Sequence, residues 1–343
     1  LCFVYEIIPQ CLLIGGGAVR LFFAISGFVV TLSLREKLNA IQGDVFLDRL
    51  FSAKGLLLSF YKKRFFRIFP VVLFTTILLG TFLNFTENDL TWAAALFRAP
   101  MEIFWGAYNN TLELFALREK VHLSGLGLFW TLAVEAQFYI LWPIILLACR
   151  NDNARAIVSL SLGLLFVLLI KPVLDAHYGE KYYLIYDNLS ELFLGSFLAF
   201  LYGENSSAKS KTKFAQLVAA VLAMTIWFYP NTMEKNFYST MVISFSSVLL
   251  VALAVFSSES FKIPVLHKVF DYIGSRSFSF YAVQLTLANI VVYYTNSIYF
   301  PKEAFSEQKF YCYQFVIFIV ALGIVTELTY RFIEKPFRQF GRR

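Results

Sequence analysis

One carboxylate stands inside a long apolar segment of this sequence. Residues 126–149, LGLFWTLAVEAQFYILWPIILLAC, are long and apolar enough to cross a membrane, and Glu135 lies near their middle. A charged side chain at the centre of a bilayer costs about 3 kcal/mol on insertion scales. A carboxylate kept at that cost is typical of a functional position, and the alternative is a structural hydrogen-bonding centre. We therefore take Glu135 as the first candidate for chemistry.

Two arginines and two further carboxylates lie at predicted membrane boundaries. Arg64 and Arg67, in FYKKRFFRIFP (60–70), share one face of a predicted helix start, where paired guanidinium groups could grip a diphosphate. The alternative, which this segment taken alone favours, is an anchoring cluster for anionic lipid headgroups. Asp187 and Glu191 are four residues apart and share a helix face. That spacing suits proton exchange, unless Asp187 is solvated near the outer boundary.

The sequence offers little support for other familiar chemistries. The cysteines have no metal-ligand spacing and the histidines fall in separate predicted loops, so no metal site is predicted. Phosphate-binding loops, hydrolase elbows and dinucleotide fingerprints are also missing from the sequence. Glu327 lies four residues before Arg331, and we interpret it as a structural ion-pair partner.

Membrane-spanning helices must position these residues. The 343 residues are 58% hydrophobic, 18% aromatic and only 15% charged, which indicates a polytopic membrane protein. LCFVYEII at the start resembles the outer part of an incomplete helix. The prediction is an all-α fold, a single membrane-embedded domain over 1–343 with about ten transmembrane helices, the first truncated. The other nine apolar windows are 18–34, 68–85, 126–149, 156–170, 183–202, 214–229, 238–256, 278–296 and 311–330.

Basic residues alternate between the predicted loops. One alternate set holds 21 of the 30 Lys and Arg and 8 of the 23 acidic residues: segments 35–67, 150–155, 203–213, 257–277 and 331–343. By the positive-inside rule this set is cytoplasmic, with the C-terminus, in what we expect to be the plasma membrane. The excess charge indicates orientation and contact with membrane lipids, not nucleic-acid binding. Counting 90–108 as a span would break the alternation, so we interpret it as interfacial or re-entrant.

In order, these segments resemble the acyltransferase 3 family of integral-membrane acyltransferases. AVRLFFAISGFVVT is similar to the family's second helix, with Ser26 and Gly27 in its SGF core, and FYKKRFFRIFP resembles its basic RxxR segment. FWTLAVEAQFYILWP is close to the signature W-S-L-x-V-E-x-Q-F-Y, which places its Glu and Gln on Glu135 and Gln137. YIGSRSFSFY and YRFIEKPFR are similar to two late motifs. The five matches cover nearly the whole chain.

The resemblance implies transfer of a small acyl group from acyl-CoA, most simply acetyl-CoA, to a hydroxyl of a saccharide or lipid-linked carbohydrate. Acyl-CoA is then a donor substrate, and no bound cofactor is implied. Arg64 and Arg67 would hold the CoA phosphates at the inner face. Glu135 or Glu6 would serve as the base, because a carboxylate removed from water can take up a proton near neutral pH. Candidate donors to the oxyanion are Gln137, Tyr139 and Ser26.

Several positions depart from the family pattern. Glu6 and Gln284 stand where the family commonly has histidines, and the first of these is taken as catalytic. Arg20 stands where an acid is usual, and Asn188 replaces an arginine three residues before Glu191. Two alternatives follow: a catalytically inactive relative that binds lipid or saccharide, and a transporter whose buried carboxylates handle protons or substrate.

Overall fold

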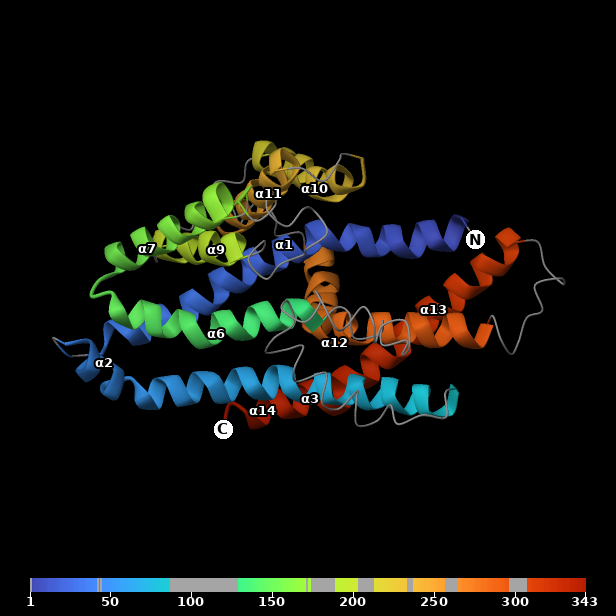
Figure 1. Cartoon of the computed structure of the whole chain (residues 1–343), viewed down its shortest axis with the longest axis horizontal. Coiled ribbons are helices and arrows are strands. Elements are labelled where there is room, and N and C mark those ends of the chain that lie inside the picture. Colours follow the sequence, from blue (N-terminus) through green and yellow to red (C-terminus); the bar gives the residue numbers. More distant parts are fainter. Residues whose placement is uncertain are drawn as a thin grey trace. The chain divides into compact units, whose positions relative to one another are not determined.

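The computed structural model describes residues 2–41, 43, 45–86, 129–170, 172–173, 189–202, 213–232, 237–256, 264–295 and 307–343. These residues form helices and no strand, which confirms the predicted all-α class. The helices, shown in Figure 1, are α1 (Cys2–Asn39), α2 (Phe46–Ser52), α3 (Lys54–Thr86), α6 (Trp130–Ala148), α7 (Asp152–Leu165), α9 (Leu189–Leu201), α10 (Lys213–Thr232), α11 (Phe237–Phe256), α12 (Pro264–Tyr294), α13 (Glu307–Thr329) and α14 (Lys335–Phe340). Two π-helical turns, η2 (Phe166–Ile170) and η7 (Tyr330–Glu334), continue α7 and α13.

Each of the nine predicted apolar windows overlaps one of these helices. Four helical stretches of the described chain are long and apolar enough to cross a membrane: Gly17–Asn39, Thr131–Ala148, Asp152–Ile170 and Phe310–Phe340. Three apolar helices are shorter: Leu189–Leu201, Gln216–Ile226 and Met241–Phe256. The membrane character is therefore supported, and the count of about ten stays a prediction. The proposed re-entrant segment, 90–108, lies outside the described residues.

Two helix boundaries differ from the sequence prediction. The N-terminal stub and the window 18–34 form one continuous helix, α1. The basic segment 60–70 is not a helix start, because α3 begins at Lys54, and Pro70 lies inside that helix. Both differences have the same cause. Hydropathy marks the length of chain suited to hydrocarbon, whereas helical hydrogen bonding continues beyond it.

Contacts divide the chain into two compact units. Unit 1 comprises Leu1–Ile7, Leu58–Ala133 and Val265–Arg343, and unit 2 comprises Ile8–Leu57 and Val134–Pro264. In unit 2, α9 packs against α7 and α11, and α10 packs against α11 (Figure 1). In unit 1, a small core joins α12 to α13 through Val283, Leu287 and Leu322. The prediction of one domain over 1–343 remains a prediction.

A close crossing of α1 and α9 holds the middle of α1 in place. A Cβ atom at Gly27 would lie 2.0 Å from the carbonyl oxygen of Leu192, and one at Gly195 would lie 2.1 Å from that of Ala24. Only glycine fits at these two positions, because any side chain would clash with backbone. Small residues that let backbones approach are typical of helix packing in membranes. Ser26, next to Gly27, therefore sits on a firmly placed part of α1.

Candidate functional site

Glu135 lies in a buried hydrogen-bonded cluster of unit 2. Its Oε1 accepts a hydrogen bond from the Ser26 hydroxyl and another, at 2.7 Å, from the Tyr139 hydroxyl. The two hydroxyl oxygens are 3.0 Å apart. The exposed fractions are 3% for Glu135, 6% for Tyr139 and 8% for Ser26. Three of the predicted site residues thus meet, and we call them the Glu135 cluster.

Local helix geometry and one further bond set up this cluster. Glu135 and Tyr139 are four residues apart on α6, so they share a face. Ser26 comes from α1, and the two helices are tied again where Trp142 Nε1 donates to Thr31 Oγ1 at 2.7 Å. Trp142 and Thr31 are fully buried. A buried hydrogen bond of this kind is costly to break, so it fixes the register of α6 against α1.

The cluster can accept and pass on a proton. Each hydroxyl carries one proton, and both are directed at the same carboxylate oxygen. Within the part of the chain that is described, Glu135 forms no ion pair, and these two hydroxyls donate hydrogen bonds to it. A base with two hydroxyl donors in place, away from water, is the arrangement that proton transfer and oxyanion stabilisation require.

Two other predicted site residues, Gln137 and Glu6, are placed on α6 and α1. Gln137 is half-buried and, two residues after Glu135, points to a different side of α6. Glu6 falls within the backbone range of α1, but its side chain lies outside the described part of the chain.

Arg64 and Arg67 belong to unit 1, so their relation to the Glu135 cluster is not described. Both are half-buried on α3, and the Arg64 guanidinium lies 5.4 Å from the centre of the Phe60 ring. The basic segment packs on the basic C-terminal helix α14, where the rings of Phe66 and Phe340 meet edge to face at 4.9 Å. Two segments rich in Lys and Arg are therefore adjacent, and such a surface suits phosphate groups.

A buried ion pair joins α1 to α9 in unit 2. Arg20 Nη1 lies 2.5 Å from Glu191 Oε1, and the side chains are 12% and 0% exposed. Ser244 of α11 bridges the pair, since its hydroxyl accepts from Arg20 at 2.9 Å and donates to Glu191 at 2.6 Å. Ser190 donates to the other carboxylate oxygen at 2.8 Å. Glu191 thus has a cationic partner in Arg20, and both of its carboxylate oxygens accept hydrogen bonds. Asp187, its predicted neighbour for proton exchange, lies outside the described residues.

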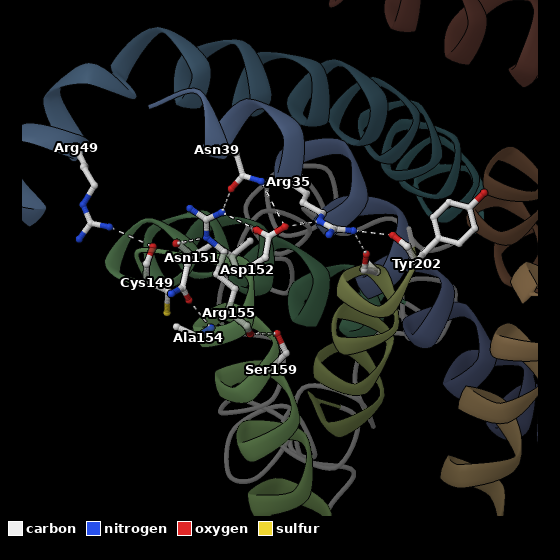
Figure 2. Close-up of polar contacts among 12 residues, drawn as sticks. Arg35, Asn39, Arg49, Cys149, Asn151, Asp152, Ala154, Arg155, Ser159 and Tyr202 are labelled. Carbon is white, nitrogen blue, oxygen red and sulfur yellow. Dashed lines mark hydrogen bonds and ion pairs between the residues drawn. The ribbon is translucent and has the colours of Figure 1, made fainter. Parts of the chain in front are cut away.

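Two arginines, Arg49 and Arg155, cap the C-terminal end of α6, and Figure 2 shows both side chains near Cys149. Arg155 Nε donates to the carbonyl of Leu146 at 3.1 Å, and Arg49 donates to those of Ala148 and Cys149 at 3.3 and 3.1 Å. The last carbonyls of a helix have no partner within it and carry partial negative charge. The guanidinium groups of Arg49 and Arg155 donate hydrogen bonds to these carbonyls. Two arginines of the predicted basic segments therefore anchor α6, the helix that carries Glu135 and Tyr139.

The same end of unit 2 contains a second cap, on α9. Arg35 donates to the carbonyls of Ala199 and Tyr202 at 3.1 and 2.6 Å, and its Nε lies 2.6 Å from Asp152 (Figure 2). Asp152 also pairs with Arg155 at 3.0 Å. Arg35 and Arg49, from the basic segment 35–67, therefore lie at the same end of unit 2 as the basic segment 150–155. None of these caps is predicted by the sequence, because backbone carbonyl acceptors are not visible in the pattern of side chains.

The two late motifs meet in unit 1. Ser279 donates to Glu334 at 2.6 Å, and Arg338 donates to the other oxygen of Glu334 at 3.1 Å. The Tyr281 and Thr131 hydroxyls are 2.5 Å apart, which joins the first of these motifs, YIGSRSFSFY, to the start of α6. Glu334 is 1% exposed and ends the π-helical turn η7, a kind of distortion that often occurs at functional sites.

The predicted pairing of Glu327 with Arg331 is confirmed, at 2.5 Å. Arg276 approaches the same carboxylate at 2.5 Å from α12. Its guanidinium also lies over two rings, 3.7 Å from the centre of Tyr272 and 4.4 Å from that of Tyr330. Glu327, on α13, is therefore a structural residue that joins this helix to α12 through its ion pair with Arg276. No group of three or more His, Cys, Asp or Glu that could hold a metal ion is found in the described parts.

Known proteins match the chain along most of its length. The sequence model of the acyltransferase 3 family, described as an acyltransferase domain, matches residues 3–329. O-acetyltransferase OatA of Staphylococcus aureus strain NCTC 8325 / PS 47 is 26% identical over 361 residues, covering 98% of this chain and 55% of OatA. OatA of strain COL matches with the same identity and shares. The chain spans about half the length of these curated relatives. No solved structure matches it significantly.

Proposed function

The chain belongs to the acyltransferase 3 family, and we propose that it is a membrane-bound O-acyltransferase that transfers a small acyl group. The donor is cytosolic acyl-CoA, most simply acetyl-CoA, and the acceptor is a hydroxyl of a saccharide or lipid-linked carbohydrate. The observation that carries the proposal is the Glu135 cluster, a buried carboxylate with two hydroxyl donors on one oxygen. The relatives' name, O-acetyltransferase, supports the reaction class and the acetyl group.

In the proposed reaction Glu135 removes the proton of the attacking hydroxyl. Attack on the thioester carbonyl places negative charge on its oxygen, and the Tyr139 hydroxyl is positioned to donate to that oxygen. The ester bond forms as the carbon–sulfur bond breaks, and the proton held by Glu135 goes to the leaving thiolate. Gln137 is a further proposed donor to the oxyanion, and Glu6 a second proposed base.

Arg64 and Arg67 are proposed to hold the CoA phosphates. Acyl-CoA is made in the cytosol and is too polar to enter hydrocarbon, so its phosphates need basic groups at the inner face. The two half-buried arginines of α3, beside the basic helix α14, supply such groups. The proposal accordingly has the chain in the plasma membrane with its C-terminus in the cytoplasm, in contact with anionic lipid.

The experiment compares acyl transfer by the unmodified protein and by Glu135→Gln. Membranes containing each protein receive acetyl-CoA labelled in its acetyl group and a panel of saccharides and lipid-linked saccharides. Because the amide cannot take up the proton, Glu135→Gln should lower transfer by at least about 100-fold. Glu36→Gln, which removes an exposed carboxylate from α1, is the matched control and should leave transfer unchanged.

Two results would overturn parts of this proposal. Full transfer by Glu135→Gln would remove Glu135 from the catalytic mechanism. Absence of transfer by the unmodified protein across the panel would favour the inactive relative that binds lipid or saccharide, the alternative that Glu6 and Gln284 raise.

A further inference from the structure

We propose that Ser26 is the nucleophile of this acyl transfer and carries the acyl group as an ester between donor and acceptor. The inference rests on the proposed function and deepens it, because it replaces one direct transfer by two. Ser26 is then a catalytic residue and not only a donor to the oxyanion.

The hydrogen bonds of the Glu135 cluster match the arrangement of an activated serine. A serine hydroxyl is a weak nucleophile until an adjacent base takes its proton. The Ser26 hydroxyl donates directly to Glu135 Oε1, so the base is in place. The Tyr139 hydroxyl lies 3.0 Å from Ser26 Oγ, within reach of the oxygen of a carbonyl group that Ser26 attacks. Nucleophile, base and oxyanion donor thus occupy one site of three side chains.

Burial distinguishes Ser26 from the other serine of the same helix, Ser33. Its exposed fraction is 8%, and it stands beside Gly27, whose backbone packs directly on Leu192. Ser33, two turns further along α1, is exposed, and its hydroxyl only donates to the Val30 carbonyl at 2.7 Å. A rigid and dry position suits an acyl ester, because exclusion of water prevents its hydrolysis before the acceptor arrives.

Each step balances with the donor and acceptor alone. In the first, Ser26 Oγ attacks the thioester carbonyl carbon while Glu135 takes the hydroxyl proton. The carbon–sulfur bond breaks, and the CoA thiolate takes that proton from Glu135. In the second, the acceptor hydroxyl attacks the ester carbon and gives its proton to Glu135. The bond from carbon to Ser26 Oγ then breaks, and the serine recovers the proton.

A carrier residue also resolves a problem of access. The proposed donor comes from the cytosol, whereas cell-surface acceptors lie across a hydrocarbon layer about 30 Å thick. Direct transfer would require both substrates to reach one buried carboxylate at the same moment. With the acyl group held on Ser26, in the middle part of the apolar stretch Gly17–Asn39, the two substrates can approach one after the other.

The test looks for the ester itself. Purified full-length protein in lipid nanodiscs is mixed with labelled acetyl-CoA without acceptor, quenched in acid, digested and examined by mass spectrometry. We expect an acetyl group on the peptide that contains Ser26, and its loss when acceptor is added before the quench. Ser26→Ala should lack the label and lower transfer by at least about 100-fold, while the control Ser33→Ala should match the unmodified protein.

A second variant guards against a folding defect in the first. Ser26→Cys keeps a nucleophile of similar size, and its acetyl group should be a thioester that neutral hydroxylamine removes, whereas the serine ester resists neutral hydroxylamine.

Transfer without any label on Ser26, or transfer by Ser26→Ala at the unmodified rate, would overturn the inference and leave the proposed function intact. Label on Ser26 without transfer would support the inference and overturn the choice of acceptor. Absence of both label and transfer would overturn both.

Discussion

Removing Arg20 should destabilise the protein more than removing its partner Glu191. The pair is buried, with nitrogen and oxygen 2.5 Å apart, but the side chains differ in exposure, 12% for Arg20 and 0% for Glu191. Among the described residues, Arg20→Met leaves the fully buried carboxylate of Glu191 with the hydroxyls of Ser190 and Ser244 as its donors. Removing one partner of a buried ion pair costs about 3–5 kcal/mol.

The opposite change, Glu191→Leu, should cost about 1–3 kcal/mol, because a long arginine with some exposure can extend toward the headgroups. In the double variant Arg20→Met with Glu191→Leu, no charge is left without a partner. Replacing a buried pair by apolar groups is often close to neutral, so the two single effects should not add, with a coupling of about 2 kcal/mol or more. Arg20→Met with Glu191→Gln should recover part of the stability as well.

The assay is equilibrium unfolding of the purified proteins by SDS in mixed micelles, followed by circular dichroism. Arg331→Met is the matched control, because Arg331 also lies 2.5 Å from its carboxylate, on Glu327, but is 65% exposed. An exposed pair contributes at most about 1 kcal/mol, so that change should have little effect. A coupling below about 0.5 kcal/mol, or a larger loss from Glu191→Leu than from Arg20→Met, would refute the reasoning.

Three further outcomes are expected. Changing both Arg64 and Arg67 to Gln should weaken acyl-CoA binding at least about 10-fold in a filter assay with labelled CoA, because two phosphate contacts are lost; unchanged binding would return them to lipid anchoring. Single cysteines placed in the loop 203–213 and at the C-terminus should resist an impermeant maleimide in intact cells, and ready labelling would reverse the topology. Ser279→Ala removes one of two donors to buried Glu334, so SDS unfolding should show a loss of about 1–2 kcal/mol; no loss would show that water replaces the hydroxyl.

The sequence predicts best those features that are encoded locally. Glu135 with Tyr139 and Glu327 with Arg331 are each four residues apart, so helix geometry alone makes them neighbours. The sequence motif alone makes Ser26 a candidate. Its hydrogen bond to Glu135, by contrast, depends on the packing of α1 against α6, which residue spacing does not reveal.

Pairings between distant residues could not be read from spacing. Arg20 and Glu191 are 171 positions apart, and Arg276, the second arginine bound to Glu327, is 51 positions away from it. Spacing reports neighbours within one helix, whereas these contacts depend on which helices pack together. Helix ends were also misjudged at Lys54, because an apolar window measures suitability for hydrocarbon and not the extent of backbone hydrogen bonding.

The Arg20 pair changes the meaning of two departures from the family pattern. Taken singly, Arg20 in place of an acid and Asn188 in place of an arginine suggest damage to a charged site. In the structure Arg20, on α1, forms an ion pair with Glu191, so this carboxylate has a cationic partner although an arginine is missing from position 188 of the sequence. These two positions therefore do not argue for an inactive protein. The departures that bear on chemistry are Glu6 and Gln284, where imidazole is missing. In the proposed reaction Glu135, with its two hydroxyl partners, acts as the base and no imidazole is required.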